Sequence, residues 1–316
     1  MQESTEMFIS NKQYLYALDV YSKLISVGDF LEDIIVVKGL VKRYGDEVAI
    51  DGLDLRIKKG EAFGFLGPNG AGKTTAVRVI STLTEFSEGE VSVGGYDILK
   101  NPKEAKRLMG VVQQHISLDK DLTVRENMMH RAMTQKIPAS ERKKRIDKLV
   151  EYIGLEEYMD RQIDSLSGGW KKRAAIVCSL LHEPKVLFLD EPTVGLDIQA
   201  RRLIWDLIRK LNDDGTTIFL TSHYIEEVEA LCGMVGIIDK GKLIAEGSPA
   251  DLCNRIGSTA VEYHGRDHKT EYRYFSSRGD ANDFASTLGD EYTVLIRNTN
   301  LEDCFVELTG KKVEEG

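Results

Sequence analysis

The sequence predicts an α/β fold in which helices cover a mostly parallel sheet. Strand-like apolar runs alternate with helical patterns between about residues 34 and 247, and this alternation is typical of parallel strands joined by helices. A glycine-rich loop separates one of these strands from the helix that follows it. From about residue 248 the pattern changes to alternating polar and aromatic residues. We therefore divide the chain into an N-terminal extension (1–33), an α/β domain (34–247) and a small α+β domain (248–316).

Composition restricts the class of protein. A chain of 316 residues with 42% hydrophobic residues can form one large or two modest folded domains. Its formal net charge of −9 argues against broad electrostatic attachment to nucleic acid, so we expect no nucleic-acid partner. The 4 cysteines show no C-x-x-C spacing, which indicates reduced thiols in a cytosolic protein. No apolar stretch approaches the roughly 18 residues of a membrane span, so any work at a membrane needs another chain to cross it.

The first elements follow from the spacing of apolar residues. In the N-terminal extension, Tyr14, Leu18, Tyr21 and Ile25 recur at helical spacing and predict one amphipathic helix. The segment 34–57 then shows strand patterns, first as a run of aliphatic residues and later as alternation of apolar and charged ones. This segment therefore begins the α/β domain.

Strand and helix patterns alternate through the rest of that domain. Short apolar runs predict buried strands at 61–66, 111–112, 186–189 and 216–220. Helices are predicted from residue 74 to 80 and from 140 to 153, and a third between the last two strands. The apolar face of this third helix comprises Ile198, Leu203, Ile204, Leu207, Ile208 and Leu211. In the C-terminal domain, 271–275 and 292–297 show the polar and aromatic alternation.

The most specific signal is a phosphate-binding loop. Its residues fit the pattern G-x-x-x-x-G-K-T and are Gly67, Pro68, Asn69, Gly70, Ala71, Gly72, Lys73 and Thr74. Glycines let backbone N–H groups crowd around phosphates, the lysine supplies a positive charge for the β and γ oxygens, and the threonine hydroxyl ligates Mg²⁺. The strand before the loop and the helix after it deliver the triphosphate to a helix N-terminus, which favours an anion. The loop predicts a nucleoside triphosphate and Mg²⁺ as ligands.

Two carboxylates follow a buried strand. Asp190 and Glu191 come directly after the apolar run 186–189, and the carboxyl end of a buried parallel strand lies at the sheet edge where ligands bind. Asp190 is therefore placed to hold Mg²⁺. Glu191, one residue further, is placed to activate an attacking water as a general base.

A second candidate cradle precedes the helix before that strand. Leu166 is followed by Ser167, Gly168 and Gly169, so a hydroxyl and unobstructed backbone N–H groups stand at a helix start. A chain that carries two phosphate cradles but needs one ATP suggests that the second cradle serves another copy. On its own, Ser-Gly-Gly is a common helix start.

Together these motifs resemble those of the ATP-binding subunits of ABC transporters. The loop 67–75, which ends at Thr75, resembles the family's Walker A motif, 166–169 its signature and 186–191 its Walker B motif. Residues 195–197 resemble its D-loop, and His223 its switch histidine.

Two further positions belong to the same likeness, which covers about 34–247. Gln114 matches the Q-loop glutamine, although its neighbour Gln113 leaves an ambiguity of one residue, and Tyr44 matches the aromatic residue that stacks on adenine. The segments 44–46 and 301–310 are similar to the branch that exports drugs, polysaccharides or other molecules through a separate permease.

The resemblance implies a P-loop ATPase domain with a mixed sheet, a helical subdomain at about 115–165, and ATP and Mg²⁺ as ligands. It implies a head-to-tail homodimer and an integral membrane permease that holds the chain at the cytoplasmic face of the membrane. The implied catalytic residues are Glu191, His223, Gln114 and Lys73, and the implied metal ligands are Thr74, Gln114 and Asp190. The implied nucleotide contacts are Tyr44, the loop 67–75, Ser167, Gly168, Gly169 and Asp197.

One position departs from the family, and one alternative class stays open. Trp170 replaces the glutamine that usually ends the signature, and it either covers the ribose of the opposite nucleotide or packs against the helix that it begins. The alternative class is a soluble ABC ATPase that acts on ribosomes or DNA. Those proteins usually carry two cassettes or a long coiled coil, whereas this chain has one phosphate loop, no heptad array and an acidic charge.

Overall fold

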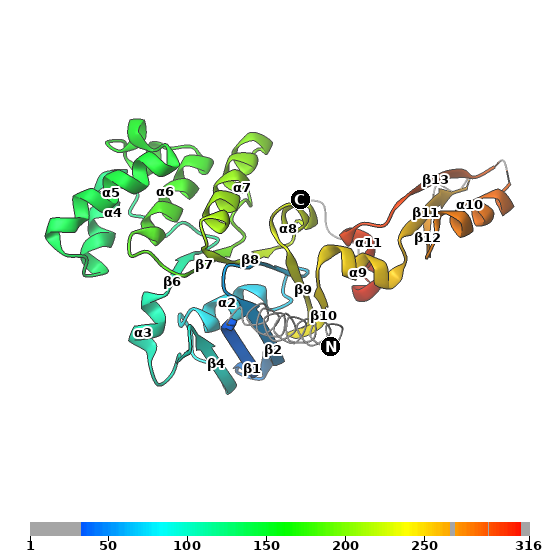
Figure 1. Cartoon of the computed structure of the whole chain (residues 1–316), viewed down its shortest axis with the longest axis horizontal. Coiled ribbons are helices and arrows are strands. Elements are labelled where there is room, and N and C mark those ends of the chain that lie inside the picture. The colour runs from blue at the N-terminus through cyan, green and yellow to red at the C-terminus, as the bar shows by residue number, and fades with distance from the viewer. Residues whose placement is uncertain (1–32, 266–268, 290, 311–316) are drawn as a thin grey trace, which may run out of the picture. The chain divides into compact units, whose positions relative to one another are not determined.

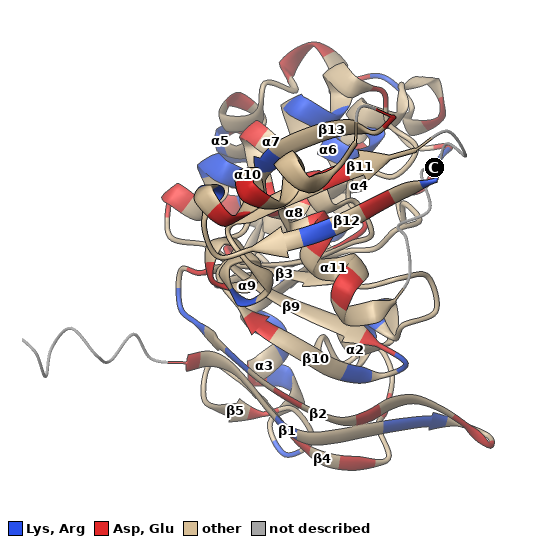
Figure 2. Ribbon diagram, turned by 90° about the vertical axis from the view of Figure 1, so that its right-hand side faces the viewer, with Lys and Arg blue, Asp and Glu red and all other residues tan. Residues whose placement is uncertain are grey.

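The computed structural model describes residues 33–265, 269–289 and 291–310. The amphipathic helix predicted around Tyr14 to Ile25 lies outside the described residues. Basic and acidic residues are interspersed over the described chain (Figure 2). Among the described residues, no helix is long and apolar enough to cross a lipid bilayer.

A six-stranded sheet forms the centre of the α/β domain (Figure 1). Its strand order is β10-β9-β3-β8-β7-β6. Neighbours from β9 to β6 are parallel, and β10 pairs with β9 in the antiparallel sense. The bounds are Ala62–Leu66 (β3), Met109–Val112 (β6), Val186–Asp190 (β7), Thr217–Ser222 (β8), Met234–Asp239 (β9) and Lys242–Gly247 (β10). The predicted α/β fold and its mixed sheet are therefore confirmed.

A second sheet has four strands in the order β2-β1-β4-β5. These are Asp33–Tyr44 (β1), Glu47–Lys58 (β2), Glu88–Val93 (β4) and Tyr96–Asp97 (β5). Helix α2 (Lys73–Ile80) contacts strands of both sheets. Apolar residues of α2 and of both sheets form one core cluster, in which Phe63, Phe188 and Phe219 are fully buried. This packing fixes the start of α2 at the carboxyl edge of β3.

Helices cover the other face and extend beyond it. They are α4 (Val124–Thr134), α5 (Ala139–Ile153), α6 (Gly168–Leu180), α7 (Ile198–Asp213) and α8 (Ile225–Leu231), with short 3₁₀ turns η1 (Glu156–Tyr158) and η2 (Ile163–Ser165). Helix α3 (Pro102–Arg107) instead contacts β5 and β6, and its Ala105 belongs to the core cluster of α2. A capping box between Thr123 and Glu126 begins α4, and Gly154 in the left-handed conformation ends α5. Residues of α4, α5 and α6 share a core with those of α7 and the sheet.

The apolar face predicted for α7 is correct only in part. Ile204, Leu207, Ile208 and Leu211 are buried, whereas Leu203 is 48% exposed and Ile198 is 69% exposed. With about 3.6 residues per turn, the four buried side chains occupy one arc of the helix. Leu203 lies at the edge of this arc, and Ile198 lies on the far side.

The C-terminal segment contains two helices that pack on the core of the α/β domain and a small sheet with its own core. The elements are α9 (Pro249–Ile256), β11 (Thr259–His264), β12 (Thr270–Phe275), α10 (Arg278–Thr287), β13 (Thr293–Asn298) and α11 (Leu301–Thr309), and the sheet order is β12-β11-β13. Leu252 of α9 and Phe305 of α11 belong to the same core cluster as Val228 of α8. Val261, Tyr263 and Ala281 form a separate cluster. The domain boundary at residue 248 stays a prediction.

We expect a chain truncated after Ser248 to bind ATP with nearly unchanged affinity but to unfold at a lower temperature. The motifs for the nucleotide all precede residue 224, whereas the truncation exposes the apolar surface of α8 and β10 that Leu252 and Phe305 cover. Nucleotide titration and thermal unfolding of the two chains check both parts. A truncated chain that is folded yet does not bind ATP would refute the two-domain division.

Candidate active site

The loop between β3 and α2 encloses a polar cavity of about 650 Å³. Gly72 of this loop has no room for a side chain, because a Cβ atom would lie 2.6 Å from the carbonyl oxygen of Ala49. Its φ of +107° also favours glycine. The N–H of Gly241 also donates to the carbonyl of Ala71 at 2.9 Å. The loop is therefore held from two sides, by β2 and by the turn after β9.

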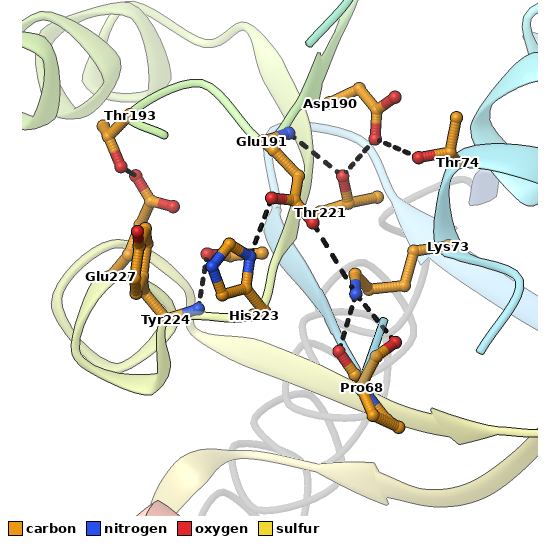
Figure 3. A network of polar contacts seen from close by, with 12 residues as sticks. Pro68, Lys73, Thr74, Asp190, Glu191, Thr193, Thr221, His223, Tyr224 and Glu227 are labelled. Atoms are coloured by element: carbon orange, nitrogen blue, oxygen red, sulfur yellow. Dashed lines mark hydrogen bonds and ion pairs between the residues drawn. The ribbon is translucent and has the colours of Figure 1, made fainter. Parts of the chain in front are cut away.

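Lys73 lies buried beneath the loop. Its ammonium donates to the carbonyl oxygens of Gly67 at 2.6 Å and Pro68 at 3.1 Å, and Nζ lies 3.6 Å from Oε1 of Glu191 (Figure 3). Burial lowers the pKa of Lys73, while the charges of Glu191 and Asp190 oppose this shift. The lysine is thus positioned at the point where a phosphate chain would enter the loop.

Asp190 stands at the end of β7 between two hydroxyl groups. Thr74 Oγ1 donates to its Oδ1 at 3.1 Å, and Thr221 Oγ1 of β8 donates to the same oxygen at 2.6 Å. A threonine hydroxyl beside a carboxylate is a set of hard oxygen donors that suits Mg²⁺. The residues present therefore fit the predicted metal.

Glu191 is held in the left-handed conformation, with φ of +47°. Its N–H donates to the carbonyl oxygen of Thr221 at 3.1 Å, and its Oε2 lies 2.7 Å from Nδ1 of His223. Non-glycine residues with this backbone are uncommon and occur often at functional sites. The strand β8 thus fixes the direction in which the carboxylate points, and Figure 3 shows it between His223 and Lys73.

The charges around Glu191 keep it ionised. Burial by itself raises the pKa of Glu191, but the hydrogen bond and charge of His223 and the charge of Lys73 outweigh burial, and the pKa lies below its ordinary value. An ionised carboxylate beside the phosphate loop can accept a proton from water.

The structure brings two distant candidates to the same cavity. Tyr44 lines it and is 46% exposed, and Gln114 lines it on the side of Glu191. Gln113 instead lines a different cavity of about 220 Å³ next to α4 and α6. The cavity lining therefore favours Gln114 over Gln113 as the Q-loop glutamine.

The signature residues lie elsewhere. Of the described residues that line the loop cavity, none belongs to Ser167–Gly169 or is Asp197. Ser167 is the N-cap of α6, but its side chain makes no capping hydrogen bond. A Cβ atom on Gly169 would lie 2.9 Å from Cβ of Ala200, so this glycine also permits α6 to pack on the start of α7. Asp197 caps α7 by accepting from the N–H of Ala200 at 2.8 Å.

Trp170 packs within this chain. Its ring stacks on Tyr158 with centroids 3.9 Å apart, and the guanidinium groups of Arg161 and Arg173 lie over Tyr158 and Trp170 at 5.2 and 4.7 Å. Of the two positions left open by the sequence, the structure thus shows packing at the start of its own helix.

Sequence reasoning missed two groups of residues at the site. Lys240 and Gly241 line the cavity from the turn between β9 and β10, and only the Lys-Gly pair in the sequence hints at a turn. Glu227 is fully buried and accepts from Thr193 Oγ1 at 2.7 Å (Figure 3). It also accepts from Trp205 Nε1 at 3.1 Å. No sequence pattern predicts that this carboxylate joins α7 and α8 to the segment after Glu191.

Comparison with known proteins finds close similarity along most of the chain. Residues 50–194 match the family described as ABC transporter. The linearmycin resistance ATP-binding protein LnrL of Bacillus subtilis (strain 168) is 44% identical over 224 residues, which cover 71% of this chain and 72% of that protein. The Nod factor export ATP-binding protein I of Ralstonia nicotianae is 37% identical over an aligned length of 306 residues. The alignment covers 89% of this chain and 95% of that protein.

Solved structures show the same similarity. The structure of cbiO1 from Clostridium perfringens, part of the ABC transporter complex cbiONQ, matches with a TM-score of 0.64 and 32% identity, over 70% of this chain and 90% of that chain. The dimeric structure of MJ0796, a bacterial ABC transporter cassette, matches with a TM-score of 0.62 and 28% identity, over 68% of this chain and 98% of that chain.

Proposed function

This chain belongs to the ABC transporter family as an ATP-binding subunit, and we propose that it hydrolyses ATP in a head-to-tail homodimer to power export by a separate membrane permease. The observation that carries the proposal is the division of the site. Lys73 and Glu191 line one cavity and His223 contacts Glu191, whereas Ser167 does not line this cavity and its hydroxyl makes no capping hydrogen bond to its own helix. The relatives named for linearmycin resistance and Nod factor export support the direction of transport.

The residues at the loop divide the work of hydrolysis. Lys73 exchanges the carbonyl oxygens of Gly67 and Pro68 for the β and γ oxygens of ATP, and the loop N–H groups donate to the phosphates. Glu191 accepts a proton from the attacking water, and His223 orients this carboxylate and contacts the γ-phosphate. Tyr44 stacks on the adenine.

The residues predicted to bind Mg²⁺ are Thr74, Asp190 and Gln114, and the ion supplies positive charge to the β and γ oxygens when bound. Within the chain itself, Thr221 holds Asp190 by a hydrogen bond of 2.6 Å. This contact fixes the carboxylate at the end of β7, in the place where Thr74 also reaches it.

The second copy completes each site. Ser167 and Gly169 of one copy would contact the γ-phosphate held by the loop of the other, so that charge stabilisation is complete only in the closed dimer. Closure and reopening would then move the permease, which would hold the chain at the cytoplasmic face of the membrane. In this proposal the permease supplies the membrane path.

A cleft between α3 and the end of α4 fits an acidic cytoplasmic segment of the permease. The cleft has a volume of about 520 Å³, and its lining within the described chain includes five basic residues and no carboxylate. The basic residues are Lys103, Lys106, Arg107, Arg131 and Lys136; α3 carries the first three. Leu83 and Met109 add apolar surface, and the buried hydroxyl of Ser81 has no hydrogen-bond partner among the described residues. The cleft borders the helical subdomain predicted at 115–165.

We expect the double change Lys103→Glu and Lys106→Glu to weaken binding to the permease at least tenfold, because the two new carboxylates on α3 would repel an acidic segment. Basal ATP hydrolysis should stay within about twofold, since neither residue lines the loop cavity. Co-purification with the membrane protein of the adjacent reading frame, followed by ATPase assays in vesicles, measures both quantities.

The matched control is Lys143→Glu with Lys144→Glu, which changes two exposed lysines of α5 away from the cleft. If both double variants bind the permease equally well, the cleft is not the docking site. Co-sedimentation of the wild-type chain with ribosomes instead of membranes would favour the soluble class of ABC ATPase.

A further inference from the structure

Lys172 of α6 is a buried lysine that binds only backbone carbonyl groups. Its side chain is 4% exposed, and Nζ donates to the carbonyl oxygens of Gln113 and Gln114, both at 3.2 Å. Among the described residues, no carboxylate oxygen lies within 4.0 Å of this ammonium. Lysine is rarely buried without a charged partner, because desolvation of the ammonium is costly.

Nearby negative charges oppose the effect of burial on the Lys172 ammonium. Burial lowers the pKa of Lys172 to about 8, and the charges of Asp190, Glu227 and Glu191 oppose this shift. The ammonium therefore lies within the field of the catalytic carboxylates while its hydrogen bonds go to the loop after β6. A hydrogen bond from a charged donor is about twice as strong as one between neutral groups.

The two carbonyl groups belong to neighbouring residues that line different cavities. Gln114 lines the ATP cavity, whereas Gln113 lines the other cavity beside α4 and α6. By holding both carbonyl oxygens, Lys172 restrains the backbone at the point where Gln114 lines the ATP cavity. Without this contact, a rotation of the peptide units would be free to move Gln114 out of the cavity.

The same helix begins at the signature. Ser167 is the N-cap of α6, and Lys172 lies five residues later, which is about 7.5 Å along the helix axis. One rigid element thus touches the Gln114 loop of its own ATP site and presents Ser167 to the site of the second copy.

We propose that Lys172 is a positioning residue that ties the Gln114 loop to the signature helix of the same copy. ATP bound in the loop of one copy contacts Ser167 of the second copy and thereby affects the geometry of Gln114 in that second copy. The proposal rests on the dimer described under the proposed function. Movement of α6 when ATP from the second copy binds is transmitted to Gln114 through the two hydrogen bonds of Lys172. ATP binding at one site then changes the geometry of the other site, which is a coupling between distinct sites.

The test is a double-mutant cycle in the full-length chain between Lys172→Met and Gln114→Ala. Methionine keeps the length of the side chain but removes the charged donor. We expect Lys172→Met to lower kcat about tenfold or more and to reduce the Hill coefficient for ATP toward 1, with KM for ATP changed less than about threefold. Because Lys172 acts through Gln114, the double variant should be no slower than Gln114→Ala alone.

Lys171→Met is the matched control, since Lys171 is the neighbouring lysine on α6 and pairs with Asp164 at 3.6 Å. Its effect on kcat should be small and should multiply with that of Gln114→Ala. Thermal unfolding of every variant identifies loss of folded protein. If Lys172→Met does not fold, Lys172→Gln, which retains a neutral donor, takes its place in the cycle.

Multiplicative losses for Lys172→Met and Gln114→Ala, with an unchanged Hill coefficient, would overturn the positioning role. This result is distinct from failure of the proposed function. In that case the Glu191→Gln variant of the otherwise native chain would form no dimer with ATP.

Discussion

The variant Glu191→Gln is expected to turn over ATP at least about a hundredfold more slowly than the native chain while binding ATP normally. Glutamine preserves the size of the side chain and the left-handed backbone at this position but cannot accept a proton from water. The contact with Nδ1 of His223 at 2.7 Å and that with Lys73 at 3.6 Å lose their ionic character. Without hydrolysis, the ATP-bound dimer should persist.

Single-turnover hydrolysis and size-exclusion chromatography with ATP measure the two effects. Glu226→Gln is a suitable control, because Glu226 is an exposed carboxylate on α8 and should tolerate the same change. Hydrolysis by Glu191→Gln at a nearly native rate would remove Glu191 from the catalytic role.

The sequence was sufficient to predict those parts of the site that are contiguous in the chain. The phosphate loop, the strand before it and the helix after it are adjacent, so their residue types and periodicity predict both structure and chemistry. The same holds for Asp190 and Glu191, because a buried strand ends directly before them. Their position at the carboxyl edge of a parallel sheet follows from the fold class.

Contacts between distant segments could not be predicted from the residues alone. The hydrogen bond from Gly241 to Ala71 and the ammonium of Lys172 on the Gln114 loop depend on how strands and helices pack. Gly169 shows a further limit of pattern reading. The sequence favours a phosphate cradle there, whereas the structure shows that the same missing side chain also permits contact with Ala200. Two physical requirements can thus select one residue type.

Helix α7 illustrates why an apolar pattern overestimates burial. Ile198 fits the list of apolar positions but lies in the first turn, directly after the N-cap Asp197. Only the arc that faces α6, α8 and β8 is covered. An apolar residue beyond that arc remains exposed, because a folded protein has too little polar surface to cover itself.

The change Ser167→Arg is expected to abolish cooperative ATP turnover and to leave ATP binding by the single subunit unchanged. Arginine places bulk and charge at the N-cap of α6, where the γ-phosphate of the opposite site would have to lie. Ser167 does not line the cavity of its own loop, so binding through Lys73 and its neighbours should persist. Steady-state ATPase rates and nucleotide titration separate the two properties.

Trp170→Gln is the matched change three residues further along the same helix, and it should remain folded with an ATPase rate within about tenfold of the native rate. The ring of Trp170 stacks on Tyr158 within the same chain, with centroids 3.9 Å apart. Such a stack contributes about 0.5–1.5 kcal/mol beyond burial, so its loss should change the ATPase rate at most about tenfold. Glutamine would give up this stack but regain a side chain that both donates and accepts hydrogen bonds. If Trp170→Gln is as inactive as Ser167→Arg, then the stack on Tyr158 does more than support the helix, because its loss alone would prevent the signature from completing the opposite site.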